Sequence, residues 1–304
     1  MASGLERLIN SSFGLQVAAS LAQAAPPKLG QIIARLAAAW IAARRKSALA
    51  RAVRANQWVV SGGTATRREL DEAVRAVFQN SARSIYELYH HLRRTESVAH
   101  MYRIDPSFQR VLDRPEFDQR GMLLGGLHTA GFDLGLRWLC LYKFKPVVLT
   151  IPSPEGGRQM EFEARRKLRM NLVPTTNQGL RTALRHLQRG GMVVTGIDHP
   201  VPGSEPQPCF FGRPAALPVD YIYLALKARV PIVVGLSRLE ADGRYGIHAS
   251  EPIEMEPARG RNDALRINAE KVLAAAEAFI RQSPLQWTVS LPVWPEAMAE
   301  VPLG

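Results

Sequence analysis

The chain has few cysteines and lacks the common signatures of metal, nucleotide and serine-hydrolase sites. Its 304 residues include only Cys140 and Cys209, and both lie in apolar segments, so we expect reduced core thiols and no disulfide. No Cys/His cluster has zinc spacing, and no glycine-rich phosphate loop occurs. The Gly-x-Ser-x-Gly pattern is also missing, which argues against an α/β-hydrolase.

The sequence also has no apolar run of the roughly 18 residues that a membrane-spanning helix needs. The nearest approach is 32–43, which carries Arg35 and Trp40 and is followed by the basic residues 44–46. That composition is typical of a helix lying in the membrane interface, and equally of a helix packed on the domain. The N-terminus lacks the features of a clear secretory signal, so we expect a protein on the cytosolic side.

Charge is unbalanced: 39 Lys and Arg stand against 27 Asp and Glu, a net charge of +12. Such a surface favours an anionic partner, which could be nucleic acid, an anionic membrane or a phosphorylated substrate. No nucleic-acid motif is visible, and the aromatic residues do not interleave with the basic runs. We therefore expect no nucleic-acid partner, and a solvated basic face is the simpler alternative to a binding surface.

The hydrophobic pattern changes along the chain. Residues 1 to about 110 are predicted to be helical, with an Ala- and Arg-rich stretch at 29–55 and a capping box at Thr66–Glu69. From 121 onward, short apolar strands alternate with helical stretches, which predicts an α/β sheet with helices on both faces. Strands are expected at 121–127, 146–151, 171–174, 192–197, 231–236 and 244–250, and helices at 130–141, 161–170, 178–189, 218–228 and 263–282.

This pattern divides the chain into three parts of one continuous structural domain. We expect a helical, membrane-associating part at 1–110, an α/β core at 111–290 and a C-terminal tail at 291–304.

The most informative motif is His128, followed five residues later by Asp133, directly after the glycine-flanked apolar run 121–127. A histidine at a strand end can act as a general base near neutral pH, and a nearby carboxylate can orient it. The same spacing follows His91 and His100, but these lie in or behind a helical run, where residues five apart point away from each other. From this segment alone, a structural histidine is an equally good interpretation.

Several further segments, taken with His128 and Asp133, make the chain resemble the bacterial lipid A biosynthesis acyltransferases of the lauroyl and myristoyl type. These belong to the lysophospholipid acyltransferase group, which shares a His-x4-Asp motif. The order and spacing hold over roughly 50–290. The matching segments are 55–57, 78–80, 196–198, 210–215, 226–233, 238–245 and 280–287.

The resemblance implies a glycerol-phosphate acyltransferase-like fold, a mixed sheet flanked by helices. It implies an O-acyltransferase that moves a fatty acyl chain from acyl carrier protein or coenzyme A to a hydroxyl of a lipid A precursor or related glycolipid. The enzyme would need no resident cofactor or metal and would lie, peripheral or monotopic, on the cytoplasmic face of the inner membrane. His128 would be the general base, and Asp133 would hold its tautomer.

The tetrahedral oxyanion of this reaction needs hydrogen-bond donors, for which the backbone N–H groups after His128 and the Arg165 side chain are candidates. Further substrate-binding candidates each have a structural alternative, namely a solvated charge, a turn cap or core packing. They are Arg165, Arg213 and Arg238 for phosphates, Asp198 for the acceptor or its headgroup, and Phe210, Phe211 and Gly212 for the acyl slot. Residues 242–243 are expected to form a hairpin turn, and 284–287 to pack the C-terminus onto the domain without a chemical role.

The sequence departs from the family in a less hydrophobic leading helix, in the residues 288–292 and in His199-Pro200 after Asp198. These differences bear on the acceptor. It could instead be a phosphatidylinositol mannoside, another lipid or a natural product. The alternative from a different class is a non-catalytic basic membrane-binding protein.

Overall fold

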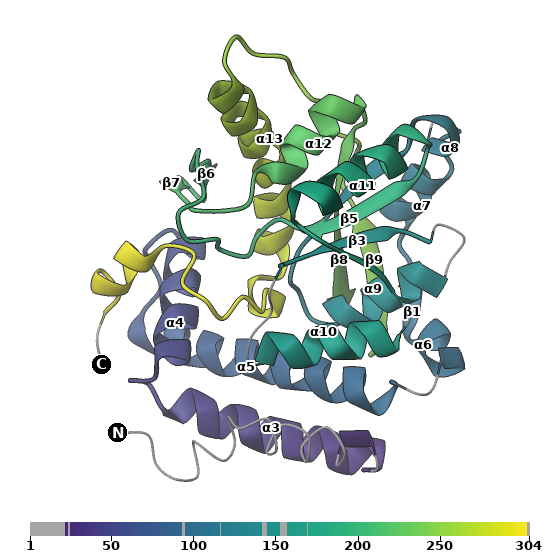
Figure 1. The fold of residues 1–304 in the computed structure, drawn as a ribbon. Helices are drawn as coiled ribbons and strands as arrows, with labels where there is room; N and C mark the ends of the chain where they lie inside the picture. Colours follow the sequence, from purple (N-terminus) through teal and green to yellow (C-terminus); the bar gives the residue numbers. More distant parts are fainter. Residues whose placement is uncertain are drawn as a thin grey trace.

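The computed structural model describes residues 22–23, 25–92, 95–115, 117–141, 145–152, 157–168 and 170–302. Within these ranges, helices surround a central sheet (Figure 1). The expectations for the first 21 residues and for the last two lie outside the described residues.

The N-terminal part consists of α3 (Pro27–Ala43), α4 (Ala48–Val60) and α5 (Arg67–His90), with α3 lying along α5 (Figure 1). The stretch predicted at 29–55 is thus two helices, because the Ser47 Oγ accepts the Ala50 N–H and starts α4 anew. The predicted capping box at the start of α5 is confirmed. Gly30 lets α3 approach α5 closely, since a Cβ there would lie 2.0 Å from the Tyr86 ring.

A short strand, β1 (Tyr102–Ile104), interrupts the part that the sequence predicts as entirely helical. It follows α6 (Thr95–Met101) and precedes α7 (Pro106–Leu112) and α8 (Phe117–Arg120). The purely helical prediction is wrong here because three residues carry no readable period, and β1 exists through its pairing with a strand far along the chain.

The central sheet has seven strands in the order β1-β9-β8-β2-β5-β3-β4. Its remaining strands are β2 (Met122–Gly126), β3 (Val147–Thr150), β4 (Asn171–Pro174), β5 (Met192–Gly196), β8 (Ile232–Leu239) and β9 (Tyr245–Ala249). The other helices are α9 (Phe132–Leu141), α10 (Gly157–Lys167), α11 (Asn177–Gln188), α12 (Asp220–Ala228) and α13 (Arg261–Gln282). All the predicted strands and helices after residue 120 are present, which confirms the α/β fold.

The sheet is mixed, as the resemblance implies. β8 and β9 pair antiparallel across the predicted turn, where Gly243 has a φ of +82°, whereas the other neighbours pair in parallel. A small two-stranded sheet, β6 (Cys209–Phe210) with β7 (Arg213–Pro214), stands apart from the main sheet.

Neighbouring strand residues point to opposite faces, and each face has its own core. Leu123 of β2 packs in a cluster with α11, α12 and α13, while Leu124 packs in a second cluster with α7 and α9. Helices therefore cover both faces of the sheet, as predicted.

Cys140 and Cys209 are free, but Cys209 is exposed because it lies in the small outer strand β6, so its assignment to the core is wrong. The segment expected as a C-terminal tail packs on the domain, and Trp294 is fully buried.

In the described part of the chain, every helix is too short or too polar to cross a bilayer.

Candidate active site

The parallel pairing of β2 and β5 places the central pair of side chains. Gly126, the last residue of β2, lies opposite Gly196, the last residue of β5. His128 and Asp198 each follow two residues later, so they leave the sheet together at its carboxyl edge, where parallel α/β sheets form their sites. The His128 Nδ1 lies 2.6 Å from the Asp198 Oδ1, and the His128 backbone N–H donates to the Asp198 Oδ2 over 2.9 Å.

The Asp198 carboxylate is fully buried and held by a third donor. The indole Nε1–H of Trp287 donates to the Asp198 Oδ2 over 2.8 Å. Burial alone would raise the pKa of Asp198, but the neighbouring His128 and these hydrogen bonds outweigh burial and lower it. The carboxylate therefore stays ionised and binds the imidazole. The direct contact with an acceptor that the sequence suggests for Asp198 is wrong, because its oxygens are enclosed by protein.

The His128 ring is oriented so that its second nitrogen is available. Its side chain is 26% exposed, and its Nε2 has no hydrogen-bond partner among the described residues. Burial lowers the pKa of His128, but the Asp198 carboxylate raises it by a larger amount, so the net shift is upward. Because the carboxylate accepts from Nδ1, the proton of the neutral ring belongs on Nδ1 and the lone pair on Nε2.

Gly196 leaves room for the His128 ring, since a Cβ at that position would lie 2.5 Å from the His128 Cε1. The rings of Phe132 and His199 lie beside the imidazole, with centroids at 4.6 and 5.2 Å.

Asp133 has a different partner from the one expected. Its Oδ1 accepts from the Nε–H of Arg165 on α10 over 2.7 Å and forms an ion pair with the Arg165 Nη2 at 2.6 Å. The expected pairing of Asp133 with His128 is therefore wrong. Asp133 lies in the first turn of α9, facing α10, whereas the His128 ring turns towards the end of β5. Arg165 and His128 are both neighbours of the Phe132 ring: the Arg165 guanidinium lies 6.0 Å from its centroid and the imidazole centroid 4.6 Å from it.

The backbone N–H groups after His128 are already engaged. Thr129, Ala130, Gly131 and Phe132 donate, respectively, to the Leu127 carbonyl, the Gln286 carbonyl, the Ser84 hydroxyl and the Thr129 carbonyl. These four donors are therefore unsuitable for an oxyanion, which corrects one of the two expectations. Arg165 remains the nearby donor that the sequence singles out.

An apolar cavity of about 50 Å³ lies beside Phe132, which is one of its lining residues. It is lined mainly by β2, β8 and α9, and Gly126, Gly135 and Gly235 leave its space open. A Cβ at Gly126 would lie 2.9 Å from the Phe132 ring, and one at Gly235 would lie 2.8 Å from Leu124. The Phe132 ring thus lies between this apolar cavity and the His128 imidazole, since it lines the first and contacts the second.

The family model of the bacterial lipid A biosynthesis acyltransferases matches residues 4–295. The chain belongs to this family. Its members are acyltransferases, so the chain is an acyltransferase, with an acyl donor and a lipid acceptor as its general substrates. A comparison with curated proteins gives no match.

The residues expected at the acyl slot, Phe210, Phe211 and Gly212, lie apart from the cavity beside Phe132. Phe210 is fully buried, with its ring centroid 5.4 Å from that of Trp294 and 6.2 Å from that of Trp287. Phe211 is also buried, with its ring centroid 4.8 Å from that of Phe210 and 5.9 Å from that of Trp294. Gly212 occupies the turn with a φ of +76°. None of the three lines the cavity beside Phe132. Phe210 alone of the three has a ring contact with Trp287, the residue that holds Asp198.

The two remaining arginine candidates have protein partners. Arg213 binds Glu300 with two contacts of 2.6 and 2.7 Å, and Arg238 contacts Glu240 at 3.1 Å and Gln282 at 3.2 Å. Among the described residues, no hydrogen bond or ion pair joins the guanidinium of Arg213 or Arg238 to His128.

Trp287 and Gly196 are residues of this site to which the sequence interpretation gave no role there. The Gln286-Trp287 ending gave a signal, since it belongs to a specific matching segment, but only the fold shows its indole reaching Asp198. Among the described residues, no cluster of three or more His, Cys, Asp or Glu side chains is arranged to hold a metal ion.

Proposed function

We propose that this acyltransferase moves a fatty acyl chain from an acyl thioester to a hydroxyl of a lipid A precursor or related glycolipid, with His128 as general base. The observation that carries the proposal is the His128 ring, bound to Asp198 through Nδ1 with Nε2 free, beside an apolar cavity. A hydroxyl has a pKa far above 7, so a positioned base is the group that its attack requires.

In this reaction the acceptor oxygen attacks the thioester carbonyl carbon while the His128 Nε2 takes the hydroxyl proton. Asp198 stabilises the imidazolium that forms and fixes the tautomer, and Trp287 holds the carboxylate in place. The carbon–sulfur bond then breaks, the ester forms, and the departing thiolate takes the proton from Nε2. The step needs no covalent enzyme intermediate.

Arg165 is the proposed electrostatic partner of the tetrahedral oxyanion. Its side chain is only 17% exposed, and Asp133 holds its guanidinium through one carboxylate oxygen. A fixed guanidinium in a partly buried site stabilises developing negative charge without reorganising. Asp133 is then a positioning residue for Arg165, so both members of the His-x4-Asp motif serve the reaction through different partners.

The apolar cavity beside Phe132 is the proposed entry of the acyl slot. Its present volume of about 50 Å³ is far below the roughly 300–1,000 Å³ of typical ligand pockets. A fatty acyl chain would therefore enter as Phe132 and neighbouring side chains move apart. This places the thioester carbonyl at the mouth of the slot, next to His128.

We place the enzyme on the cytoplasmic face of the inner membrane, as a peripheral or monotopic protein. Supporting this, α3 exposes a row of large apolar side chains, and the net charge is +12. The exposed residues are Leu29, Ile32, Ile33, Leu36 and Trp40. Such a helix with a basic flank binds anionic lipid surfaces.

The test combines donor and acceptor screening with a base-deficient variant. Purified protein is incubated with lauroyl- or myristoyl-loaded acyl carrier protein or coenzyme A, and with a lipid A precursor, a phosphatidylinositol mannoside or a total lipid extract. Mass spectrometry should show one added acyl group on a lipid, and His128→Ala should abolish it while vesicle binding remains. Vesicle binding without turnover on any pair would favour the non-catalytic membrane-binding protein instead.

A further inference from the structure

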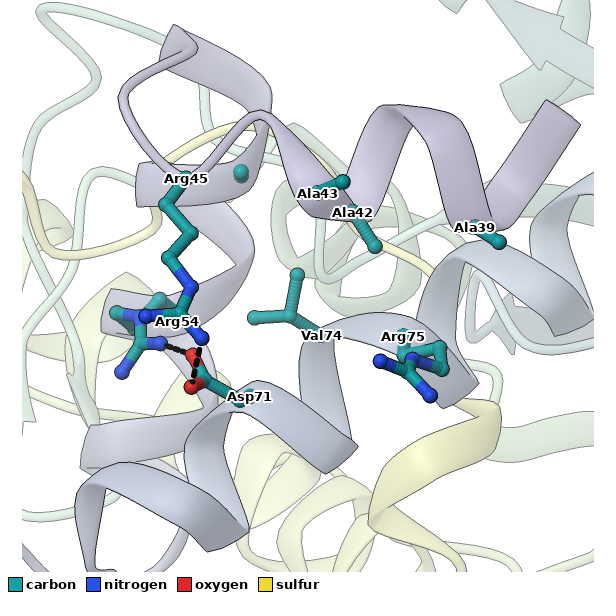
Figure 2. Close-up of a pocket in the computed structure, with 9 residues that line it drawn as sticks. Ala39, Ala42, Ala43, Arg45, Arg54, Asp71, Val74 and Arg75 are labelled. Carbon is teal, nitrogen blue, oxygen red and sulfur yellow. Dashed lines mark hydrogen bonds and ion pairs between the residues drawn. The ribbon is translucent and has the colours of Figure 1, made fainter. Parts of the chain in front are cut away.

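A second pocket, apart from the His128 site, lies between α3, α4 and α5 (Figure 2). Its volume is about 230 Å³, larger than the cavity beside Phe132. Small side chains of α3, Ala39, Ala42 and Ala43, form one wall and leave the space open. The opposite wall carries charged side chains from α4 and α5.

The charges around this pocket are unbalanced. Arg45, Arg54 and Arg75 line it together with one carboxylate, Asp71, which leaves a surplus of two positive charges. Arg45 and Arg54 both bind Asp71, the first with its Nη2 2.7 Å from the Asp71 Oδ2 (Figure 2). Arg75 lies beyond Val74 and forms no ion pair with any residue in the described ranges.

Arg54 also has an unused donor. Its side chain is 11% exposed, and its Nη1 is buried without a hydrogen-bond partner in the described part of the molecule. Burial lowers the pKa of Arg54, and the nearby positive charges of Arg45 and Arg67 lower it further. A buried donor that lacks a partner destabilises the folded protein. An anion that accepts a hydrogen bond from the Arg54 Nη1 would therefore stabilise it.

We propose that the pocket between α3, α4 and α5 binds a phosphate group, as the headgroup phosphate of an anionic lipid. Guanidinium groups pair with phosphate oxygens through parallel charge-assisted hydrogen bonds. Three arginines from two helices and one connecting loop would surround one phosphate. Asp71 holds Arg45 and Arg54 in place, and its single negative charge neutralises one of the three positive charges.

The lipid source follows from the position of the pocket on α3. At about 100° of rotation per residue, Ile32, Leu36 and Trp40 lie on the side of the helix next to Ala39 and Ala43. The exposed apolar row would enter the membrane interface, and the pocket beside it would meet the headgroups. The catalytic side lies further along α5, since Ser84, which contacts Gly131, is about 14 Å from Arg75 along the helix. The pocket is thus separate from the reacting atoms.

The first experiment measures phosphate binding by the full chain through its thermal unfolding midpoint, titrated with inorganic phosphate against a chloride control of equal ionic strength. Wild type should show saturable stabilisation. Arg75→Gln should raise the apparent Kd by about tenfold, the scale expected for one charged hydrogen-bonded contact. Asp71→Asn should lower the apparent Kd, because it releases Arg45 and Arg54.

The matched control is Arg185→Gln, which removes the same charge from an exposed position on α11, outside the pocket. It should leave the apparent Kd unchanged. Absence of saturable binding in wild type, or equal effects of Arg75→Gln and Arg185→Gln, would overturn the proposal.

The second experiment distinguishes the lipid from free phosphate. Co-sedimentation is measured with phosphatidylcholine vesicles, with and without phosphatidic acid. For a lipid headgroup, Arg75→Gln should weaken binding to the phosphatidic acid vesicles several-fold more than Arg185→Gln does, and millimolar glycerol phosphate should compete with wild type. If the soluble phosphates bind but Arg75→Gln and Arg185→Gln sediment alike, the lipid part is overturned and the pocket is a site for free phosphate.

Discussion

Replacing Asp198 with Asn should stop the proposed reaction with little change in shape. The amide keeps the size of the carboxylate and an oxygen that can accept from the His128 N–H and the Trp287 Nε1–H. Its NH₂ group, however, would face the His128 Nδ1 and force the proton onto Nε2, which then cannot act as a base. Loss of the correct tautomer in a comparable acid–base unit lowers kcat by about 10⁴-fold, or about 5.4 kcal/mol at about 1.36 kcal/mol per tenfold change.

The pH dependence gives an independent signature of the same variant. The pKa of His128 is raised above its ordinary value because the pull of Asp198 outweighs burial. Wild-type kcat/KM should therefore fall as pH drops through that raised pKa, where the base becomes protonated. In Asp198→Asn burial remains and the carboxylate is gone, so the residual activity should show its acidic limb at lower pH.

Asp133→Asn is the control, because it removes the other carboxylate and loosens Arg165 without touching Nδ1. It should lower kcat and shift the acidic limb much less than Asp198→Asn. The assay is kcat/KM for acyl transfer between pH 5 and 9, with circular dichroism as the check on folding. Retention of activity within about tenfold in Asp198→Asn, or a larger shift in Asp133→Asn, would refute the assignment of the pair.

Three further substitutions test other parts of the site. Arg165→Lys keeps the charge but loses the fork, so kcat should fall by about 10²–10³-fold with KM nearly unchanged; a change confined to KM would make Arg165 a binding residue. Gly196→Ala places a Cβ against the imidazole and should lower kcat by about 10²-fold through misplacement, with wild-type turnover contradicting the described ring position. Arg213→Ala breaks only the contact with Glu300, so acyl transfer should stay within about twofold; a large rise in KM would instead return Arg213 to the substrate site.

Much of the fold was predictable because its helices and strands have a clear hydrophobic period and clear start and end signals in the sequence. The buried runs that became β2, β5 and β8 are continuous and apolar, as strands covered on both faces are. β1 was not predictable, because its three residues form a strand only by pairing with β9. The break between α3 and α4 depends on the Ser47 side chain, which caps α4 by accepting the Ala50 N–H.

The site was predictable in composition but not in pairing. The strand before His128 and the strand before Asp198 each had a readable end, yet only the register of β2 against β5 brings the two side chains together. Asp133 was the expected partner of His128 because it is near in the sequence, but its carboxylate faces Arg165. The contact of Trp287 with Asp198 spans 89 positions and has no local signal. Tertiary pairing therefore decides which residues of the motif segments act on one another.

The most direct measurement of the central claim is the protonation state of the His128 imidazole by ¹⁵N NMR of the full-length enzyme across pH. The account predicts a pKa above the ordinary histidine value, with the neutral ring carrying its proton on Nδ1 and Nε2 unprotonated. Asp198→Asn should lower that pKa and move the proton to Nε2. A neutral ring protonated on Nε2 in the wild-type enzyme, or a His128 titration that Asp198→Asn leaves unchanged, would contradict the account.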